Sequence, residues 1–552
     1  MLTRILVFPI VCFFLVFSCK GQPLQQKKTF SRQDTLRGTI TPERAWWDVT
    51  CYTVAINTDF ASKTIEGKCI IQFRVLNPGN RMQIDLQQPM EISRAYSGER
   101  KYTFTREGNI YYIHFPEVMQ TNSLQTITLV FRGKPLIARR PPWDGGWIFT
   151  KDSLGRPWMT VACQGLGASA WYPCKDHQSD EPDSAFINIA VPDTLVGIAN
   201  GKFLGKQSFS PGWMTYRWAV RNPINNYNIV PYIGKYVSWN ETYTGEKGKL
   251  DCEYWVLDYN LQKAKQQYRQ VPGMLKCFEH WFGPYPFYED GYKLVEAPHL
   301  GMEHQSAIAY GNKFQNGYLG KDLSGSGWGT KWDFIIVHES GHEWFANSIT
   351  SNDIADMWVH EGFTNYSETL FTECEFGKEA GSDYLTGLRK IIKNDIPVIG
   401  PYGVNQEGSG DMYAKGANLI HTIRQVINDD EKFRNILRGL NSTFYHKTVN
   451  SKDVETYISK ESGIDFSKVF DQYLRTVQIP VLEYNAGKRS VRYRWTNCLE
   501  GFDMKIKVKL NNDKEEWIQP TQNWKTLTLS TEYDGKTFIV DRNFYIQTKK
   551  KH

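Results

Sequence analysis

Several features that often define a protein class are weak or missing in this sequence. Its ten cysteines are widely spaced and include no CxxC pair, so neither a dense disulfide framework nor a cysteine-built zinc site is expected. The spacing leaves open whether Cys163 and Cys174 pair. The net charge of +6 is modest for 552 residues, and the one marked basic run, 549–551, is typical of a solvated tail, so no nucleic-acid partner is expected. We find no internal repeat, and after the leader no apolar run is long enough to span a bilayer.

The amino terminus has the pattern of an export signal. A short basic start is followed by an apolar run from Ile5 to Phe17 and then by Ser18 and Cys19. We expect residues 1–19 to be a signal peptide and Cys19 to become a lipidated first residue, as in bacterial lipoproteins. The alternative is plain secretion with cleavage nearby. Residues 20–39 are polar and are predicted to be a tether. The predicted location is periplasmic or at the outer membrane or cell surface, with membrane contact only through the lipid.

The remaining sequence divides into three parts by its hydrophobic periodicity. Residues 40–248 contain alternating strands such as the one through Ile71 and Phe73, and they predict a β-rich domain. Residues 249–479 change to helical periodicity, and residues 480–552 return to alternation, which predicts a small β-sandwich. The expected fold class is therefore multidomain α+β.

The most informative motif is an H-E-x-x-H sequence within the helical part. His338 and His342 are four residues apart, so on a helix they lie one turn apart on the same face and can bind one metal ion. Glu339 lies between them, where it can reach a water molecule on that ion. The apolar and aromatic residues on both sides of the motif indicate a buried helix.

A second motif supplies a third ligand. Glu361 follows His342 by 19 residues, which is enough for the first helix to end and a second helix to return. Two histidines, one glutamate and an open position make a catalytic zinc site, whereas structural zinc is usually closed by four protein ligands. We therefore expect one zinc ion per chain, bound by His338, His342 and Glu361.

A segment upstream of the zinc motif gives the resemblance to a known family. With the zinc motif, Pro298-His299-Leu300-Gly301-Met302-Glu303-His304-Gln305 resembles the aminopeptidase N family, gluzincins that carry a G-x-M-E-N exopeptidase motif. The resemblance implies that Gly301 and Met302 belong to an edge strand along which the substrate backbone lies, and that Glu303 binds the free α-amine. A buried ammonium beside zinc needs such a carboxylate partner.

The match to the family is incomplete at two positions and extends to two further residues. Leu300 stands where the family has its first Gly, and His304 stands where it has Asn, so the first substrate pocket is expected to differ. Tyr413 matches the family tyrosine whose hydroxyl stabilises the oxyanion, and Gln164 matches a glutamine that helps to hold the substrate amino terminus.

The family likeness implies a thermolysin-like catalytic domain and a zinc aminopeptidase that acts on peptides with a free amino terminus. Glu339 is then the general base that accepts a proton from water. No helical superhelix follows the last strands, so the chain resembles a shortened, three-domain member with a more open site. Three alternatives remain at this point: an epoxide hydrolase similar to the leukotriene-processing relative, an endopeptidase in which Glu303 does not face the cleft, and an inactive peptide-binding scaffold.

Overall fold

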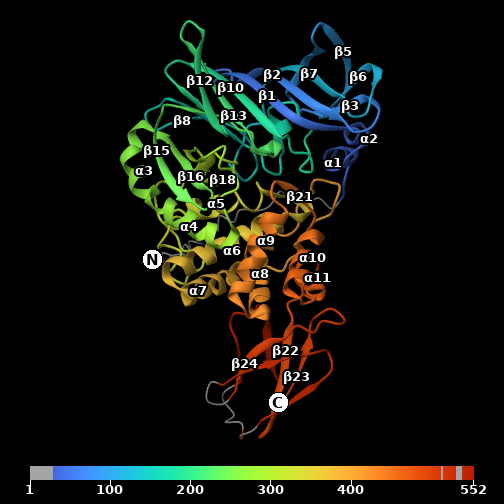
Figure 1. The fold of residues 1–552 in the computed structure, drawn as a ribbon, viewed down its shortest axis with the longest axis vertical. Coiled ribbons are helices and arrows are strands. Elements are labelled where there is room, and N and C mark those ends of the chain that lie inside the picture. Colours follow the sequence, from blue (N-terminus) through green and yellow to red (C-terminus); the bar gives the residue numbers. More distant parts are fainter. Residues whose placement is uncertain (1–28, 511–513, 530–531, 533–537, 552) are drawn as a thin grey trace, which may run out of the picture.

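The computed structural model describes residues 29–510, 514–529, 532 and 538–551. Figure 1 shows three tiers along the long axis, with β-sheets at one end, helices in the middle and a smaller strand-rich part at the other end. The expected multidomain α+β fold is thereby confirmed. Signal residues 1–19 lie outside the described part of the chain.

The amino-terminal tier is built from a ten-stranded and a four-stranded sheet. The large sheet has the order β12-β13-β10-β1-β2-β7-β4-β5-β6-β3, and the smaller one has the order β11-β14-β9-β8. Alternate residues of each strand point to opposite faces, which explains why the inner faces fill with aliphatic and aromatic side chains. The strands are β1 (Trp47–Asp59), β2 (Thr64–Val75), β3 (Gly79–Asp85), β4 (Glu91–Ser97), β5 (Arg100–Glu107), β6 (Ile110–Met119), β7 (Leu124–Gly133), β8 (Gly146–Lys151), β9 (Pro157–Ala162), β10 (Ser184–Pro192), β11 (Val196–Ile198), β12 (Lys202–Ser210), β13 (Trp213–Val220) and β14 (Tyr232–Gly234).

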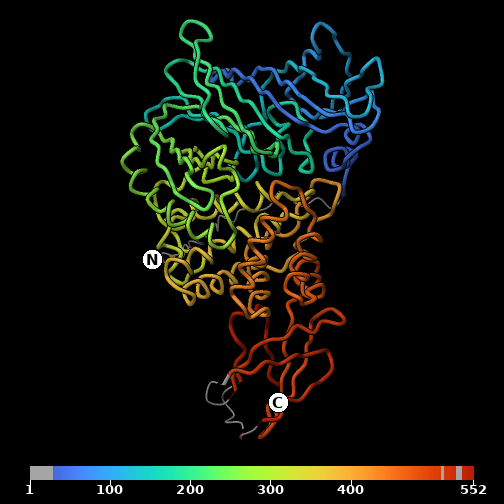
Figure 2. Tube along the Cα trace, viewed as in Figure 1, coloured from blue at the N-terminus to red at the C-terminus, as the bar shows by residue number. Residues whose placement is uncertain are grey.

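The expected tether is wrong for its last residues. The helix α1 (Arg32–Gly38) forms there, with Ser31 capping its first turn and Leu36 buried, and α2 (Pro42–Ala45) follows. Thr39 Oγ1 also donates to the carbonyl of Gly403 at 2.9 Å, so this segment lies beside the helical tier (Figure 2). A capping box and a buried leucine are enough to fold a segment whose composition is otherwise polar.

A five-stranded sheet connects the first tier to the helices. Its order is β15-β16-β17-β19-β18, so β18 lies at an edge. The predicted boundary between residues 248 and 249 falls at the start of β16, and both strands of the β15–β16 hairpin belong to this one sheet. These strands are β15 (Tyr236–Gly245), β16 (Gly248–Leu257), β17 (Tyr292–Glu296), β18 (Gly301–Met302) and β19 (Ile308–Tyr310).

The two faces of this sheet belong to different hydrophobic cores. Leu294 and Ile308 join the core of the helical tier, while Val295 and Ala309 join the core of the amino-terminal tier. The sheet therefore fixes the helices against the amino-terminal sheets. The helices and short strands of this tier are α3 (Leu261–Gln267), α4 (Val271–Phe282), α5 (Phe334–Gly341), β20 (Ile349–Ser351), α6 (Trp358–Phe376), α7 (Lys378–Leu388), α8 (Ala414–Ile427), α9 (Asp430–Thr443), β21 (Lys447–Val449), α10 (Ser451–Ser462) and α11 (Ser467–Leu474).

The carboxy-terminal tier contains two small sheets, with the orders β26-β23-β22-β28 and β25-β24-β27. Their strands are β22 (Val481–Ala486), β23 (Ser490–Thr496), β24 (Ile506–Leu510), β25 (Lys514–Ile518), β26 (Lys525–Thr528), β27 (Phe538–Val540) and β28 (Gln547–Lys550). Their buried residues are continuous with the core of the helical tier.

One disulfide joins two helices of the helical tier. Cys277 of α4 is bonded to Cys374 of α6, whereas Cys163 and Cys174 are both free and buried. The open question of a Cys163–Cys174 pair is therefore answered in the negative.

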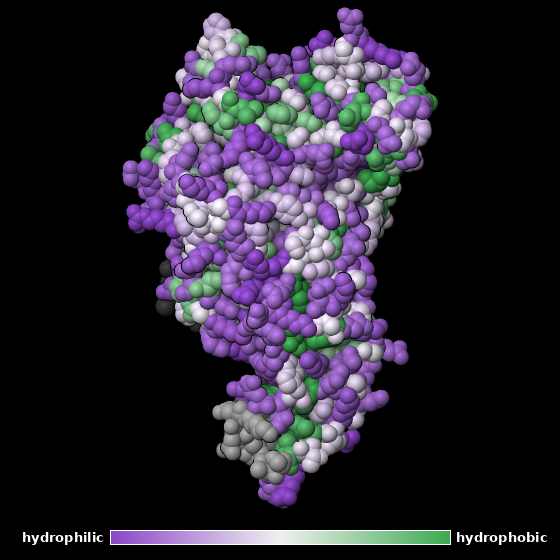
Figure 3. Space-filling model, viewed as in Figure 1, coloured by the Kyte–Doolittle hydropathy of each residue, from purple (hydrophilic) through white to green (hydrophobic). Residues whose placement is uncertain are grey.

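The surface in Figure 3 is mainly hydrophilic over the helical tier, with scattered apolar groups. Among the described residues, no helix is both long and apolar enough to cross a membrane.

Candidate functional site

The two histidines of the H-E-x-x-H motif lie at the end of the short helix α5. Asp333 caps the start of this helix by accepting from the amides of Ile335 and Ile336 at 3.1 and 3.3 Å. His338 lies on the helix and His342 directly follows its last residue while keeping helical backbone angles. The two rings therefore lie on one face, 4.9 Å apart between centroids.

Glu361, on the first turn of α6, completes a candidate metal centre. Its Oε2 lies 3.6 Å from His338 Nε2 and 3.4 Å from His342 Nε2, distances too long for good hydrogen bonds. This oxygen is buried and has no hydrogen-bond partner within the described part of the chain. One nitrogen from each imidazole and one carboxylate oxygen thus lie within 4.8 Å of one another. A buried, unpartnered acceptor facing two imidazoles fits a zinc ion.

The other ring nitrogens are engaged by the protein, which orients both imidazoles. His338 Nδ1 donates to Glu368 Oε1 at 2.7 Å, and His342 Nδ1 donates to the carbonyl of Phe345 at 3.0 Å. Such contacts fix the tautomer so that Nε2 is the free ligand atom. His360, next to Glu361 in the sequence, accepts instead from the amide of Ser351 at 2.8 Å. The helix geometry correctly predicts that His360 turns away from the metal centre.

Glu339 lies beside this centre in a buried position. Burial raises its pKa to about 7, while the neighbouring His338 and His342 lower it. Its Oε1 is only 2.5 Å from the point where a Cβ on Gly301 would lie, and Ile335 Cδ1 is 2.9 Å from the same point. Glycine at position 301 is therefore what allows the edge strand to approach the Glu339 carboxylate.

The strand that carries Gly301 has a free edge, as the resemblance implied. β18 pairs with β19 through Gly301–Tyr310 and Met302–Ala309, and none of the described strands lies on its other side. The Met302 side chain points into the amino-terminal core. The unpaired side of β18 can accept an extended peptide as an additional strand.

Glu303 follows this strand and is only 2% exposed. Its Oε1 accepts a hydrogen bond from Gln164 Nε2 and another from the Tyr227 hydroxyl at 3.1 Å. Burial raises its pKa, while the nearby His342 lowers it. Oxygens of Glu303 and Glu339 lie within 4.8 Å of each other and of a His342 nitrogen. The structure thus brings Gln164 and Glu303 together beside the metal centre.

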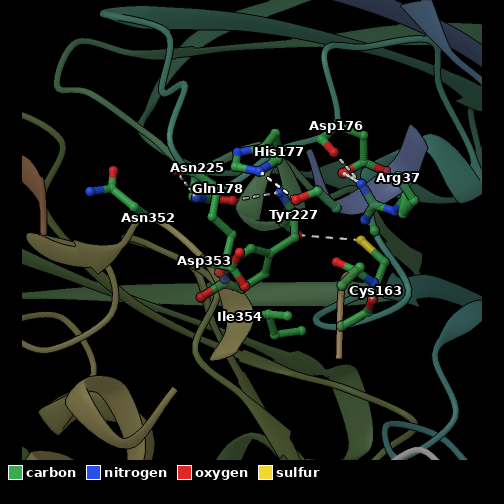
Figure 4. Close-up of a pocket in the computed structure, with 14 residues that line it drawn as sticks. Arg37, Cys163, Asp176, His177, Gln178, Asn225, Tyr227, Asn352, Asp353 and Ile354 are labelled. Atoms are coloured by element: carbon green, nitrogen blue, oxygen red, sulfur yellow. Dashed lines mark hydrogen bonds and ion pairs between the residues drawn. The ribbon is translucent and has the colours of Figure 1, made fainter. Parts of the chain in front are cut away.

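Tyr227 is a contact that the sequence did not reveal. It belongs to a short turn capped by Asn225, and no motif marks it. Figure 4 shows it beside a small cavity that Cys163, Arg37 and Asp176 also line. The cavity volume is about 30 Å³, which suits roughly one water molecule.

The two departures from the family motif leave Glu303 in place. The His304 ring turns into the amino-terminal tier, where Nδ1 lies 2.6 Å from the Tyr232 hydroxyl. Burial lowers the pKa of His304 well below its ordinary value, so the ring is neutral. Leu300 is half-buried and lines a cleft beyond the strand.

Tyr413 and Glu407 face the same site from the segment that precedes α8. The Tyr413 ring stacks on His338 with centroids 6.0 Å apart, and burial raises its pKa well above 10, so the hydroxyl keeps its proton. The pKa of Glu407 is raised to about 7 by burial and by the charges of Glu361 and Glu303. No sequence motif marks Glu407, because it lies in an irregular loop.

Comparison with known proteins agrees with this geometry. Residues 268–473, which include the helices of the metal centre, match the family model of the peptidase family M1 domain. The chain is 21% identical to human aminopeptidase B over 459 residues, which cover 75% of this chain and 66% of the relative. It is 22% identical to leukotriene A-4 hydrolase of Xenopus laevis over 332 residues, or 56% of this chain and 51% of that one.

Solved structures show the same fold. An M1 zinc metallopeptidase from Deinococcus radiodurans superposes with a TM-score of 0.68 at 18% identity, covering 79% of this chain and 95% of that one. A mutant of the same protein, solved with a Tyr-Ser-Ala substrate, gives the same TM-score. The chain thus spans about two thirds of aminopeptidase B and nearly the whole of the Deinococcus structure.

Proposed function

We propose that this chain, whose residues 268–473 match peptidase family M1, is a zinc-dependent aminopeptidase that removes the first residue from peptides. The observation that carries the proposal is the position of Glu303. It is a buried carboxylate next to the candidate metal centre, at the end of an edge strand with a free side. A substrate ammonium supplies the opposite charge that such a buried carboxylate requires.

The residues around the metal centre suit peptide hydrolysis. We assign the metal ligands as His338, His342 and Glu361. A zinc ion bound there supplies a Lewis acid that polarises a carbonyl and makes water more acidic. The buried Glu339 accepts a proton from the attacking water and returns it to the leaving amine. The protonated hydroxyl of Tyr413 donates to the oxygen that becomes negative in the transition state.

Substrate orientation follows from the edge strand and its acidic end. Gly301 and Met302 provide backbone groups for an extended peptide, while Glu303 fixes the ammonium with Gln164 and Tyr227 at its side. Because the amine is fixed, the first peptide bond is the one that faces Glu339. An endopeptidase lacks this constraint.

The proposal is tested by comparing peptides with free and acetylated amino termini. An acetylated peptide leaves Glu303 without a cation, so we expect kcat/KM to fall by about 100-fold or more. Glu339→Gln, which keeps the size of the side chain but cannot accept the proton, serves as the inactive control. Equal rates on both peptides would indicate an endopeptidase, and absence of cleavage with bound zinc would indicate a peptide-binding scaffold.

We further propose that the chain is exported and anchored by a lipid on Cys19. The apolar leader that ends at Cys19 supports both parts of this proposal, and the Cys277–Cys374 disulfide supports export, since disulfides persist mainly outside the reducing cytoplasm. Cells labelled with a fatty-acid analogue should yield labelled wild-type protein and unlabelled Cys19→Ser protein. A wild-type protein that is unlabelled and periplasmic would favour plain secretion instead.

A further inference from the structure

The cleft that Leu300 lines has a volume of about 650 Å³ and lies beyond the start of the edge strand. Its walls come from four parts of the molecule: the β8–β9 hairpin, the region of helix α3, the segment between β17 and β18, and the loop that follows β19. Leu300, the residue immediately before β18, is also part of its wall. The cleft is therefore continuous in sequence with the strand along which we place the substrate.

The direction of a bound peptide follows from two fixed points. Its ammonium lies at Glu303, and its first peptide bond faces Glu339, whose carboxylate touches Gly301. Going from Glu303 to Gly301 means going backwards along β18, so the peptide runs antiparallel to this strand. At about 3.4 Å per residue, this direction would carry the residues after the cleaved bond past Leu300, towards the cleft that Leu300 lines.

The cleft wall carries three lysines that have no ion-pair partner among the described residues: Lys151, Lys263 and Lys313. The two acidic groups in the wall are already engaged. Asp152 accepts from Arg156 Nε at 2.7 Å. Glu296 accepts from the amide of Leu257 at 2.8 Å and from Asn260 Nδ2 at 2.7 Å; burial raises its pKa to about 7, and the nearby charge of Lys263 lowers it. The charge that the lysines bring to the cleft wall is therefore not fully balanced by these two acidic groups, and the wall is positive.

Lys313 lies in a loop whose strained backbone is held by hydrogen bonds. Lys313 and Phe314 both have positive φ angles, 56° and 57°, which are uncommon for residues other than glycine. The buried Asn312 holds the loop by donating to the carbonyl of Gly317 and to Asp333 Oδ1, both at 2.8 Å. Because Asp333 also caps α5, the same carboxylate binds both this loop and the helix that carries His338. Strain that is held in this way is often found at ligand sites.

We propose that this cleft binds the carboxyl-terminal part of short peptide substrates and that its three lysines recognise the terminal carboxylate. The inference rests on the proposed aminopeptidase function, because that function sets the direction of the peptide. It implies that the enzyme prefers short peptides with a free carboxyl terminus over the same peptides with a terminal amide.

The test uses tri-, tetra- and pentapeptides of alanine, each as the free acid and as the amide. For at least one length we expect kcat/KM to be about five- to tenfold higher for the acid, the size expected when a substrate charge pairs with exposed lysines. The acid-to-amide ratio should fall towards one in Lys263→Ala/Lys313→Ala and invert in Lys313→Glu. Because the ratio is measured within each variant, general losses of activity cancel. Lys101→Ala, on the distant strand β5, is the matched control and should keep the wild-type ratio.

Two outcomes separate this inference from the proposed function. An aminoacyl fluorophore has no residues after the cleaved bond and does not reach the cleft. If the fluorophore is cleaved but acid and amide peptides react equally at every length, the carboxylate site is wrong and the aminopeptidase assignment stands. If the wild type cleaves neither the fluorophore nor the peptides, the proposed function itself fails. Amidated peptides with glutamate at the third or fourth position distinguish a terminal carboxylate from an acidic side chain.

Discussion

The contact between Gly301 and Glu339 makes Gly301→Ala the sharpest test of the proposed mechanism. The new Cβ would lie 2.5 Å from Glu339 Oε1, about 0.9 Å short of an ordinary contact near 3.4 Å. Its other close neighbours, Ile335 Cδ1 and Cγ2 at 2.9 and 3.0 Å, are the ends of a side chain. The strand is held between two cores, so the carboxylate rather than the backbone has to move.

The size of the effect follows from that displacement. Misplacing a catalytic group by about 1 Å can cost 100-fold in rate, so we expect kcat to fall by about 100-fold. The overlap with side-chain ends should cost about 1–3 kcal/mol of stability, which leaves the protein folded. Zinc content should stay at one per chain, because the three metal ligands are not touched.

The assay combines turnover of an aminoacyl fluorophore, zinc content by elemental analysis and the thermal unfolding midpoint. Gly273→Ala is a matched control: its Cβ meets Glu375 Oε1 at 3.4 Å and no closer atom. If the Gly301→Ala protein is folded, contains zinc and turns over as fast as wild type, Glu339 is not a general base whose position depends on this strand. Loss of zinc in that variant would also contradict the reasoning, since the predicted damage is confined to the base.

Two further predictions concern the neighbours of the metal centre. Glu368→Gln should weaken zinc affinity about 10- to 100-fold, because Glu368 orients the His338 ring through Nδ1. Competition with a chelator measures this affinity, and an unchanged value would mean that the contact does not orient the ligand. Tyr413→Phe should lower kcat with little change in KM, because its hydrogen bond strengthens only in the transition state; a change in KM alone would contradict that role.

The parts of the site that could be predicted from the sequence are those fixed by local geometry. The four-residue spacing of His338 and His342 places them on one helix face whatever surrounds them, and Glu361 follows at a distance that a returning helix can span. The direction of the His360 side chain, away from the metal centre, follows equally from its position around helix α6. Alternating strands and helical periodicity likewise predicted the α+β architecture, because both patterns reflect which faces are buried.

Tertiary structure alone decided which distant groups surround these residues. Tyr227 reaches Glu303 and Glu407 faces Glu361 only because the amino-terminal sheets and an irregular loop pack against the catalytic helices. The Cys277–Cys374 bond was equally hidden, since 97 residues separate its ends and only the packing of α4 on α6 brings them together. Residues 32–38 became a helix rather than a tether because Ser31 caps them and Leu36 finds a buried position. Spacing along the chain fixes what lies within one or two turns of a helix, whereas contacts between tiers depend on the burial of whole faces, which short motifs do not encode.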